Sequence, residues 1–446
     1  MSGTLKPGSV STKLSRIAEL ARQAPERALT TLAHHIDIEL LREAYRRTRK
    51  DGAPGVDGQT AEEYERDLES NLQSLLDRFK SGSYRAPPVR RVHIPKGDGS
   101  KTRPIGIPTF EDKLLQRAVT MILEAVYEQD FMDCSFGFRP RRSAHMALRC
   151  LRHGLMEMGG GWVLEVDIKG FFDALDHSHL RAFLDQRVLD GVMRRMIDKW
   201  LKAGVLEDGQ LKHPETGSPQ GGVVSPVLAN VYLHVVLDQW FEVVVKPCLR
   251  GSAFLVRYAD DFVIAFANEQ DARRVNDVLV KRFAKYGLTI HPEKTRLVRF
   301  CRPGPTTRGK GQDVSGERPG SFDLLGFRHY WCRSRRGYWV IKQKTAPSRF
   351  RRALKRIAAW CQRNLHRPIA EQYHVLAAKL LGHCQYYGIT GNSVALERFR
   401  HEMMRVWRLW LNRRSQRSRM TWERFNAMLR LFPKLPAKCV HSVYVR

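Results

Sequence analysis

Closely spaced cysteine pairs are missing from this sequence. Its 8 cysteines are scattered between positions 134 and 439, and no Cys-x-x-Cys pair occurs. Structural zinc sites need such pairs, so zinc ribbons and four-cysteine nuclease modules are excluded. In a chain of 446 residues, scattered cysteines indicate reduced and mostly buried thiols rather than a disulfide framework.

Long apolar runs are also scarce. No apolar stretch approaches the roughly 20 residues that a membrane-spanning helix needs. Residues 1–20 lack the apolar core of a secretory signal, and the chain shows neither internal repeats nor low-complexity blocks. We therefore expect a protein that works inside a cell and has no membrane partner.

Acidic residues are few compared with basic ones. The chain has 46 Asp and Glu against 76 Lys and Arg, which gives a formal net charge of +30. Such an excess costs self-repulsion, which a long polyanion relieves, so nucleic acid is the expected partner. A merely solvated surface and an anionic membrane surface are the alternatives. The hydrophobic share of 43% is that of a globular protein, and the length favours two or three packed subdomains.

The N-terminal part of the chain reads as mainly helical. Apolar spacing predicts a helix over 12–50, turn-forming residues predict a break at 51–58, and a second helix is expected over 60–80. Thr109 begins another helix, with Asp112 three residues on as a partial capping box. Because this last helix has a core-facing apolar stripe, we expect it to serve as scaffold.

Strands are predicted at several points before residue 270. Residues 92–94 and 105–107 flank a Gly-Asp-Gly turn, which predicts a hairpin with a cationic face. Residues 162–168 form a short apolar strand that ends at an acidic residue. Residues 254–266 are typical of two strands that meet at a turn near Ala259.

The C-terminal half changes from mixed structure to helices. Ser225 and the proline after it predict a helix start, because Ser caps and Pro suits the first helical position. A Gly- and Pro-rich loop over 302–320 is expected to interrupt two strands, 297–300 and 322–331. From about Thr345, apolar residues repeat at helical spacing with basic residues between them. The fold class is therefore an α/β body with an all-α part that has a cationic outer surface.

Three carboxylates lie in apolar surroundings. Asp167 ends the strand over 162–168, and Asp260 and Asp261 lie between the two strands of 254–266. Such carboxylates are costly unless a cation offsets them. Magnesium binds carboxylate oxygens together with substrate phosphates, and two ions ~3.5–4 Å apart can clamp both oxygens of a phosphoryl transfer. Taken singly, each aspartate also fits a turn residue or a helix cap.

Three segments carry a distinctive series of motifs. They are Val166-Asp-Ile-Lys-Gly-Phe-Phe-Asp173, Ser218-Pro-Gln-Gly-Gly222 and Arg257-Tyr-Ala-Asp-Asp261. In this order and spacing they resemble the motifs of reverse transcriptases, specifically those encoded by group II introns. The resemblance extends from about Arg47 to Trp331 and includes His291-Pro-Glu-Lys-Thr295, whose lysine has a supporting role.

The resemblance implies a role for each candidate site residue. Asp167, Asp260 and Asp261 would be catalytic and would bind two Mg²⁺ ions, which activate a primer 3′-hydroxyl against a nucleotide α-phosphate. Phe172 matches the aromatic residue that excludes ribonucleotides. Three further residues match the site of the incoming dNTP: Lys96 and Arg103, which hold the triphosphate, and Gln220, which packs beside the nucleotide. General contact with the nucleic acid backbone is the alternative for both cations.

The resemblance also implies a right-hand polymerase with an antiparallel palm sheet. An N-terminal extension and the start of the fingers would cover 1–80, the fingers 81–160, the palm 161–335 and a helical thumb or maturase domain 336–446. Most thumb aromatics are expected to form its core. Its RNA-binding cations would be Arg349, Arg351, Arg352, Lys355, Arg356 and Arg405. The chain resembles compact members of the family that lack the endonuclease domain.

The sequence thus predicts an RNA-directed DNA polymerase that also binds its intron RNA to assist splicing and retrohoming. The expected partners are the intron RNA template, a DNA primer or target, and dNTPs, in the bacterial cytoplasm or nucleoid. One alternative is a domesticated bacterial reverse transcriptase that serves phage defence or spacer acquisition. The other is a non-catalytic RNA-binding splicing cofactor.

Overall fold

The structure is a computed structural model, and it divides into two compact units. It describes residues 10–96, 101–207, 210–212, 217, 221–304, 320–414 and 419–442. The first unit consists of Met1–Ala147, Val166–Ile264 and Gln270–Arg296. The second consists of Leu148–Glu165, Ala265–Glu269 and Leu297–Arg446.

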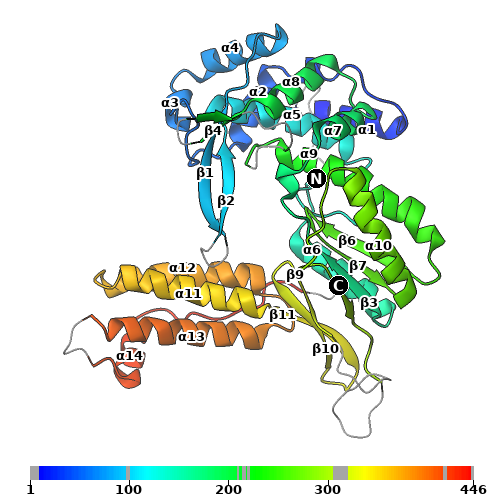
Figure 1. The fold of residues 1–446 in the computed structure, drawn as a ribbon. Coiled ribbons are helices and arrows are strands. Elements are labelled where there is room, and N and C mark those ends of the chain that lie inside the picture. Colours follow the sequence, from blue (N-terminus) through cyan, green and yellow to red (C-terminus); the bar gives the residue numbers. More distant parts are fainter. Residues whose placement is uncertain are drawn as a thin grey trace. The chain divides into compact units, whose positions relative to one another are not determined.

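The first unit is rich in helices, as Figure 1 shows. They are α1 (Val10–Gln23), η1 (Ala33–His35), α2 (Ile38–Arg47), α3 (Ala61–Glu65), α4 (Leu68–Lys80), α5 (Phe110–Tyr127), η2 (Phe171–Asp173), α7 (His177–Asp185), α8 (Gly191–Lys202), α9 (Ser225–Leu233), η3 (His234–Val245), η4 (Lys246–Cys248) and α10 (Glu269–Lys285). Helix α6 (Ala144–Glu157) begins in this unit and ends in the second. The predicted break after α2 and the helical segment over 60–80 are confirmed, the latter as α3 and α4.

The prediction of one helix over 12–50 is wrong. The chain leaves α1 just before Pro25, which cannot donate a helical hydrogen bond. A new helix starts where the Asp37 side chain accepts a hydrogen bond from the Leu40 N–H. The segment between α1 and α2 is held by Arg187, which is buried and paired with Asp130. The Arg187 guanidinium also donates to the carbonyl oxygens of Ala21, Ala24, Pro25 and Arg27.

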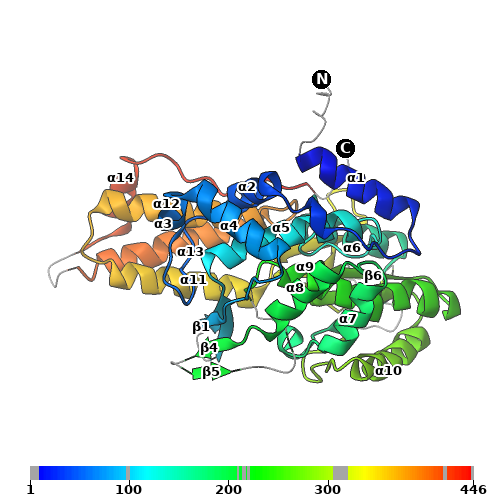
Figure 2. The ribbon, with the colours of Figure 1, turned by 90° about the horizontal axis from the view of Figure 1, so that it is seen from above.

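The predicted hairpin is confirmed as β1 (Val89–Lys96) and β2 (Lys101–Ile107), which pair antiparallel with Val92 opposite Ile105. Its Gly-Asp-Gly turn lies outside the described residues. Strands β4 (Val205–Glu207) and β5 (Gln210–Lys212) extend the sheet to the order β2-β1-β4-β5. Figure 2 shows β4 and β5 beside β1.

A second sheet carries the acidic motifs. Its strands are β6 (Ala253–Tyr258), β7 (Asp261–Phe266), β3 (Trp162–Val166) and β8 (Arg296–Arg299), in the order β6-β7-β3-β8. The predicted pair of strands with a turn near Ala259 is confirmed, and so are the predicted strands at 162–168 and 297–300, within one or two residues.

The helical run Ser225–Cys248 contains α9, η3 and η4. It has 24 residues and a mean hydropathy of 1.2 in its most apolar segment, so the expectation that no apolar stretch approaches membrane-spanning length is wrong by length and composition. Of that segment, 72% is buried in the protein, as in the core helix of a soluble fold. The predicted start is one residue off, since Val224 is the N-cap and Ser225 already belongs to the helix.

The second unit combines a small sheet with a helical bundle. Strands β9 (Phe322–Leu324), β10 (Phe327–Arg333) and β11 (Trp339–Thr345) pair antiparallel. The prediction of one strand over 322–331 is wrong, because Leu325 (φ 50°) and Gly326 (φ 81°) turn the chain back on itself. The predicted loop lies mostly outside the described residues, and β11 was not predicted.

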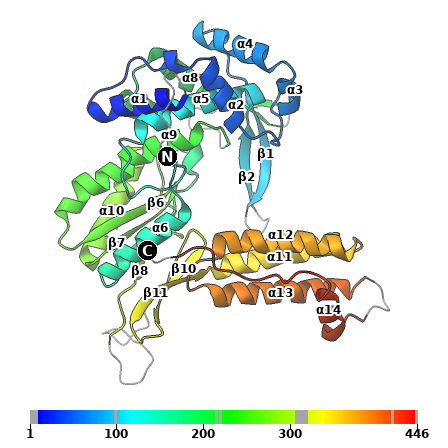
Figure 3. The same ribbon diagram turned by 180° about the vertical axis from the view of Figure 1, so that it is seen from behind.

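The predicted helical domain is confirmed in the second unit. Its helices are α11 (Pro347–Arg363), α12 (Ile369–Tyr387), α13 (Ser393–Leu411) and α14 (Trp422–Leu429). Helices α11, α12 and α13 lie side by side in Figures 1 and 3. They share a core that includes Leu376, Phe399 and Trp407, so aromatic side chains do serve the interior here.

The cysteines are less buried than predicted. All eight lie in the described part of the chain, and none of them forms a disulfide. Cys134, Cys361 and Cys384 are buried, whereas Cys150, Cys248 and Cys439 are exposed. The remaining two are intermediate, so the expectation of mostly buried thiols is wrong.

Candidate active site

A two-residue turn between β6 and β7 carries the first acidic motif. Ala259 has a φ of 57°, which is the left-handed region that residues with a Cβ rarely adopt. Asp260 follows it and is half-buried, and Asp261 begins β7 and is exposed. Both carboxylates therefore reach solvent at this end of the hairpin.

The end of β3 lies at the same edge of the sheet as this turn. Gly161, just before β3, lies against the end of β7, because a Cβ built on Gly161 would come within 2.2 Å of the Phe266 carbonyl oxygen. Since β3 and β7 are neighbours in the sheet, this contact makes them antiparallel. The last residue of β3 and the first residue of β7 then share one edge, which brings Asp167 to the edge that carries Asp260 and Asp261.

Asp167 lies one residue beyond β3 and has a cationic partner. Its backbone oxygen accepts a hydrogen bond from the His291 N–H at 2.8 Å. Its carboxylate Oδ2 accepts from Lys294 Nζ at 2.9 Å. The predicted supporting role of Lys294 thus has a concrete contact, which is an ion pair with the first of the three aspartates.

The donor set at this edge fits a hard divalent cation by its chemistry. Three carboxylates offer oxygen ligands, which magnesium prefers. Within the part of the chain that the structure describes, no group of three or more His, Cys, Asp or Glu side chains is close enough together to hold a metal ion. The observed partner of Asp167 is Lys294, whose ammonium group occupies one of the two oxygens of this carboxylate.

Phe172 belongs to a short 3-10 helix that follows the strand end. Gly170, with a φ of 57°, makes the bend between Asp167 and this helix. The Phe172 ring is half-buried and meets Phe171 edge-on at 5.4 Å between ring centroids. Gly217 lies close behind, since a Cβ on it would come 3.0 Å from the Phe172 carbonyl oxygen. Gly217 therefore confines the backbone of Phe172, and the ring itself contacts Phe171.

The predicted triphosphate cations lie on the β1–β2 hairpin. Arg103 is exposed on β2. Lys96 ends β1, but its side chain lies outside the described residues, as does all of Gln220. The next residue, Gly221, lies against β2, because a Cβ on it would come 2.4 Å from the Gly106 carbonyl oxygen. Gly221 therefore approaches the strand that carries Arg103.

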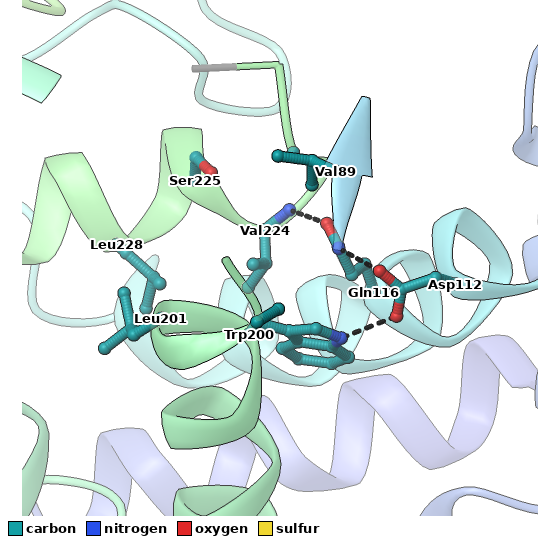
Figure 4. Close-up of a pocket in the computed structure, with 10 residues that line it drawn as sticks. Val89, Asp112, Gln116, Trp200, Leu201, Val224, Ser225 and Leu228 are labelled. Atoms are coloured by element: carbon teal, nitrogen blue, oxygen red, sulfur yellow. Dashed lines mark hydrogen bonds between the residues drawn. The ribbon is translucent and has the colours of Figure 1, made fainter. Parts of the chain in front are cut away.

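A buried hydrogen-bond network holds the segment that follows Gly221, as Figure 4 shows. The Gln116 side-chain oxygen accepts from both backbone N–H groups of 223–224, at 2.7 and 3.2 Å. Its amide nitrogen donates to Asp112 Oδ2 at 2.9 Å. The other oxygen of Asp112 accepts from Trp200 Nε1 at 2.6 Å and from the Tyr84 hydroxyl at 2.9 Å. Helix α5 is thus more than scaffold, because its Gln116 holds the backbone of 223–224.

Asp112 differs from its predicted role. Its backbone N–H does bond the Thr109 hydroxyl, so Thr109 caps α5 as predicted. The Asp112 carboxylate, however, faces the network instead of closing a capping box. Burial raises the pKa of Asp112 to about 6, against three hydrogen bonds that lower it. A cavity of about 10 Å³ beside it has room for about one water molecule.

The predicted RNA-binding cations are on the helices of the second unit. Arg352 is half-buried on α11, and Arg405 is exposed on α13, where its Nε donates to Glu402 at 2.9 Å. The other four are exposed on α11: Arg349, Arg351, Lys355 and Arg356. These four therefore present charge that no ion pair among the described residues compensates, whereas Arg405 is partly compensated.

Sequence reasoning missed two groups of residues at this site. One is the Asp112 network, and the other is a buried ion pair between Arg257 and Asp238. A signal for the second exists, since Arg257 is a charged residue within an apolar strand pattern, directly before the Tyr-Ala-Asp-Asp motif.

Residues 94–329, just over half of the chain, match the family described as "Reverse transcriptase (RNA-dependent DNA polymerase)". The group II intron-encoded protein LtrA of Lactococcus lactis subsp. cremoris is 47% identical over 167 residues, which are 37% of this chain and 27% of that protein. Protein YkfC of Escherichia coli (strain K12) is 41% identical over 241 residues, 47% of this chain and 62% of that protein. The mitochondrial nuclear intron maturase 2 of Arabidopsis thaliana is 29% identical over 279 residues, 52% of this chain and 36% of that protein.

The resemblance drawn from the motifs is confirmed by these similarities. The matched stretch contains all the predicted catalytic and dNTP-site residues, and the predicted thumb cations lie beyond it. The chain covers less than two thirds of the length of each of these three relatives.

Proposed function

Because the chain belongs to the reverse transcriptase (RNA-dependent DNA polymerase) family, we propose that it synthesises DNA on an RNA template by nucleotidyl transfer. The observation that carries the proposal is the shared sheet edge of Asp167, Asp260 and Asp261, which carries three carboxylates in an otherwise basic protein. Members of this family generally use divalent metal ions, and carboxylate oxygens suit them.

We assign the metal ligands to Asp167, Asp260 and Asp261 and the metal to two Mg²⁺ ions. When bound, such ions stabilise charge on the attacking and the leaving oxygen of the transfer. The chain's own residues then bind and select the nucleotide. Lys96 and Arg103 neutralise the triphosphate, and Gln220 packs beside the base and sugar. Phe172 excludes a 2′-hydroxyl by filling the space that it would need.

The second proposed activity is binding of intron RNA, to assist splicing and retrohoming. It is supported by the names of the relatives, which include an intron-encoded protein and an intron maturase. The exposed cations of α11 support contact with nucleic acid phosphates. On this proposal residues 1–160 form the N-terminal extension and fingers, 161–335 the palm and 336–446 the thumb. Template RNA, DNA primer and dNTPs would meet the protein in the bacterial cytoplasm.

A primer-extension assay tests the proposed polymerase. Wild type is expected to extend a DNA primer on an RNA template with Mg²⁺ and dNTPs. Asp260→Ala is expected to lose at least about 100-fold in rate while it binds the template-primer normally. Asp77→Ala, which removes an exposed aspartate of α4, is the matched control and should match wild type. Equal rates for wild type and Asp260→Ala contradict the catalytic assignment. Absence of extension by wild type favours a non-catalytic RNA-binding cofactor.

A further inference from the structure

A fully buried arginine stands two residues before the left-handed residue of the active-site turn. The Arg257 side chain has 0% exposure, and its five N–H donors are all used. Nε and Nη2 donate to the two carboxylate oxygens of Asp238, at 2.7 and 2.5 Å. Nη2 also donates to Ser135 Oγ at 2.7 Å. Nη1 donates to Asn230 Oδ1 at 2.9 Å and to the Ala259 carbonyl oxygen at 3.1 Å.

The last of these bonds reaches the turn itself. The Ala259 carbonyl belongs to the peptide that joins Ala259 to Asp260, so its direction sets where the Asp260 backbone begins. A buried ion pair adds little net stability, because desolvation of both charges offsets their attraction. A well-packed apolar pair would stabilise the fold as well. What an apolar pair cannot do is hold a carbonyl oxygen in one direction.

The partner of Arg257 lies in an unusual helix. Asp238 is in η3, which is a π-helix of 12 residues, whereas Asn230 is in the α-helix before it. Eight residues of α-helix, at about 100° each, would leave these two side chains about 80° apart around the helix axis. A π-helix bonds i to i+5 and turns less per residue. The wider turn therefore brings Asp238 back toward the face of Asn230, so that both accept from Arg257.

Arg282 of α10 supports the first turn of this π-helix. Its Nε donates to the Val236 carbonyl oxygen at 3.2 Å, and its Nη2 donates to the Val235 carbonyl oxygen at 3.1 Å. The guanidinium lies 4.6 Å from the ring centroid of Tyr286 and 5.7 Å from that of Trp240. The π-helical register is thus held by a side chain from another element.

A second segment of the chain, at Gly137, also confines the turn. Gly137 lies so close that a Cβ on it would come 2.2 Å from the Ala259 nitrogen. Asn230 Nδ2 donates to the Gly137 carbonyl oxygen at 2.8 Å, which ties this segment to the same helix. Both the N–H side and the carbonyl side of Ala259 are therefore fixed by residues far apart in sequence.

We propose that Arg257 and Asp238, with the π-helix that carries Asp238, are positioning residues that fix the Ala259–Asp260 peptide for metal binding. The inference rests on the proposed polymerase function and goes beyond it, because these residues touch neither substrate nor metal. They act on the direction of the Asp260 backbone, and through it on the affinity of the aspartates for divalent ions.

Arg257→Lys tests this role, because it keeps the charge and loses the planar fork. We expect the Mg²⁺ concentration for half-maximal primer extension to rise about tenfold and kcat to fall, since small misplacement of a catalytic group is costly. KM for dNTP and affinity for template-primer should stay within about threefold of wild type. Binding of Mn²⁺ followed by electron paramagnetic resonance, which needs no turnover, should weaken in parallel.

Arg187→Lys is the matched control. Arg187 is also a buried arginine in an ion pair, but it holds the segment between α1 and α2. The Arg187→Lys variant should lower the melting temperature as Arg257→Lys does, and it should leave the Mg²⁺ and Mn²⁺ titrations unchanged. A second variant, Arg257→Met with Asp238→Leu, replaces the pair by apolar side chains. It should keep the fold and show the same weakened metal binding.

The outcomes separate this inference from the proposed function. If either Arg257 variant folds and binds Mn²⁺ like wild type, with an unchanged Mg²⁺ requirement, the positioning role is overturned. If Arg187→Lys shifts the Mg²⁺ requirement and the Mn²⁺ affinity as much as the Arg257 variants do, the positioning role is also overturned, because loss of stability alone would then explain the effect. If instead Asp260→Ala extends primers at the wild-type rate, the proposed function itself fails.

Discussion

Lys294 Nζ lies 2.9 Å from Asp167 Oδ2, so one of the three proposed metal ligands forms an ion pair with a lysine. The two residues come from separate segments, the end of β3 and the 291–295 turn, which a backbone hydrogen bond from His291 to Asp167 holds together. An ammonium in this place competes with any metal ion for the carboxylate.

Lys294→Met is expected to raise the affinity for Mn²⁺ by about two- to fivefold. Both side chains of the ion pair are partly exposed, so the competing attraction is worth at most about 1 kcal/mol. Electron paramagnetic resonance of Mn²⁺ measures the change directly. Lys281→Met, an exposed lysine of α10, serves as control. An affinity that stays the same or falls would show that Lys294 does not compete with the metal.

Phe172→Ala is expected to raise incorporation of ribonucleotides relative to deoxyribonucleotides by at least about tenfold. The half-buried ring packs edge-on against Phe171, and its removal opens space for a 2′-hydroxyl. Single-nucleotide incorporation with matched rNTP and dNTP pairs measures the ratio. Phe172→Tyr, which keeps the wall, should preserve discrimination. An unchanged ratio in Phe172→Ala would show that Phe172 does not exclude ribonucleotides.

Gly137→Ala is expected to reduce primer extension by about 10- to 100-fold. The new Cβ would meet the Ala259 backbone at 2.2 Å, and neither backbone can move without displacing the active-site turn. Gly382→Ala is the control, because a Cβ on this α12 glycine meets nothing within 4 Å. There the substitution should stabilise the helix by about 0.5–1 kcal/mol and leave activity unchanged. Full activity of Gly137→Ala would mean that the turn tolerates displacement.

Asp112 predicts a loss of stability as the pH rises from 4 to 6. Its folded-state pKa, raised from 3.8 to about 6 by burial, means that the unfolded chain ionises first. Unfolding then releases a proton in this window, so the free energy of unfolding falls as pH rises and stays level above about pH 6. The total effect is on the order of 3 kcal/mol.

Asp112→Asn removes this titration. We expect the difference in unfolding free energy between wild type and variant to fall by about 3 kcal/mol from pH 4 to pH 7. Urea denaturation followed by tryptophan fluorescence measures it, since Trp200 donates to Asp112. A constant difference across this range would show that Asp112 ionises at its ordinary pKa in the folded protein.

The exposed cations of α11 predict the salt dependence of RNA binding. Replacement of Arg351, Lys355 and Arg356 by Gln should weaken binding and reduce the slope of log K against log salt, by about one for each lost phosphate contact. Arg405→Gln should have a smaller effect, because Glu402 already compensates Arg405. Filter binding at several salt concentrations measures both. Equal slopes for wild type and the triple variant would place the RNA elsewhere.

Local signals were enough to predict the strands that carry the acidic motifs. The apolar run before Asp167 and the polar pair between two apolar strands predict β3, β6 and β7 within one or two residues. The sequence also predicts the antiparallel hairpin of β1 and β2, because apolar residues flank its turn-forming residues. In the structure Val92 pairs with Ile105. Sequence reasoning therefore predicts the structure correctly where the spacing of apolar residues and a single turn determine it.

Predictions failed where distant residues decide the structure. Nothing local marks Leu325 as a left-handed residue that splits the strand predicted over 322–331. Apolar spacing does not predict the π-helix, because its contacts come from residues far away in the sequence. Arg282 of another helix donates to its first turn, and Arg257 of β6 pairs with its Asp238. The roles of the individual site residues and the boundaries of fingers, palm and thumb remain predictions.

Ala259 adopts a backbone conformation that its own side chain disfavours. Glycine would adopt its left-handed backbone without the roughly 1–2 kcal/mol that a Cβ costs there. A designer who optimises this chain for heat resistance would therefore choose glycine at position 259. Because the methyl group itself favours other conformations, the left-handed turn is held from outside, by the Arg257 bond to the Ala259 carbonyl oxygen and by the close approach of Gly137.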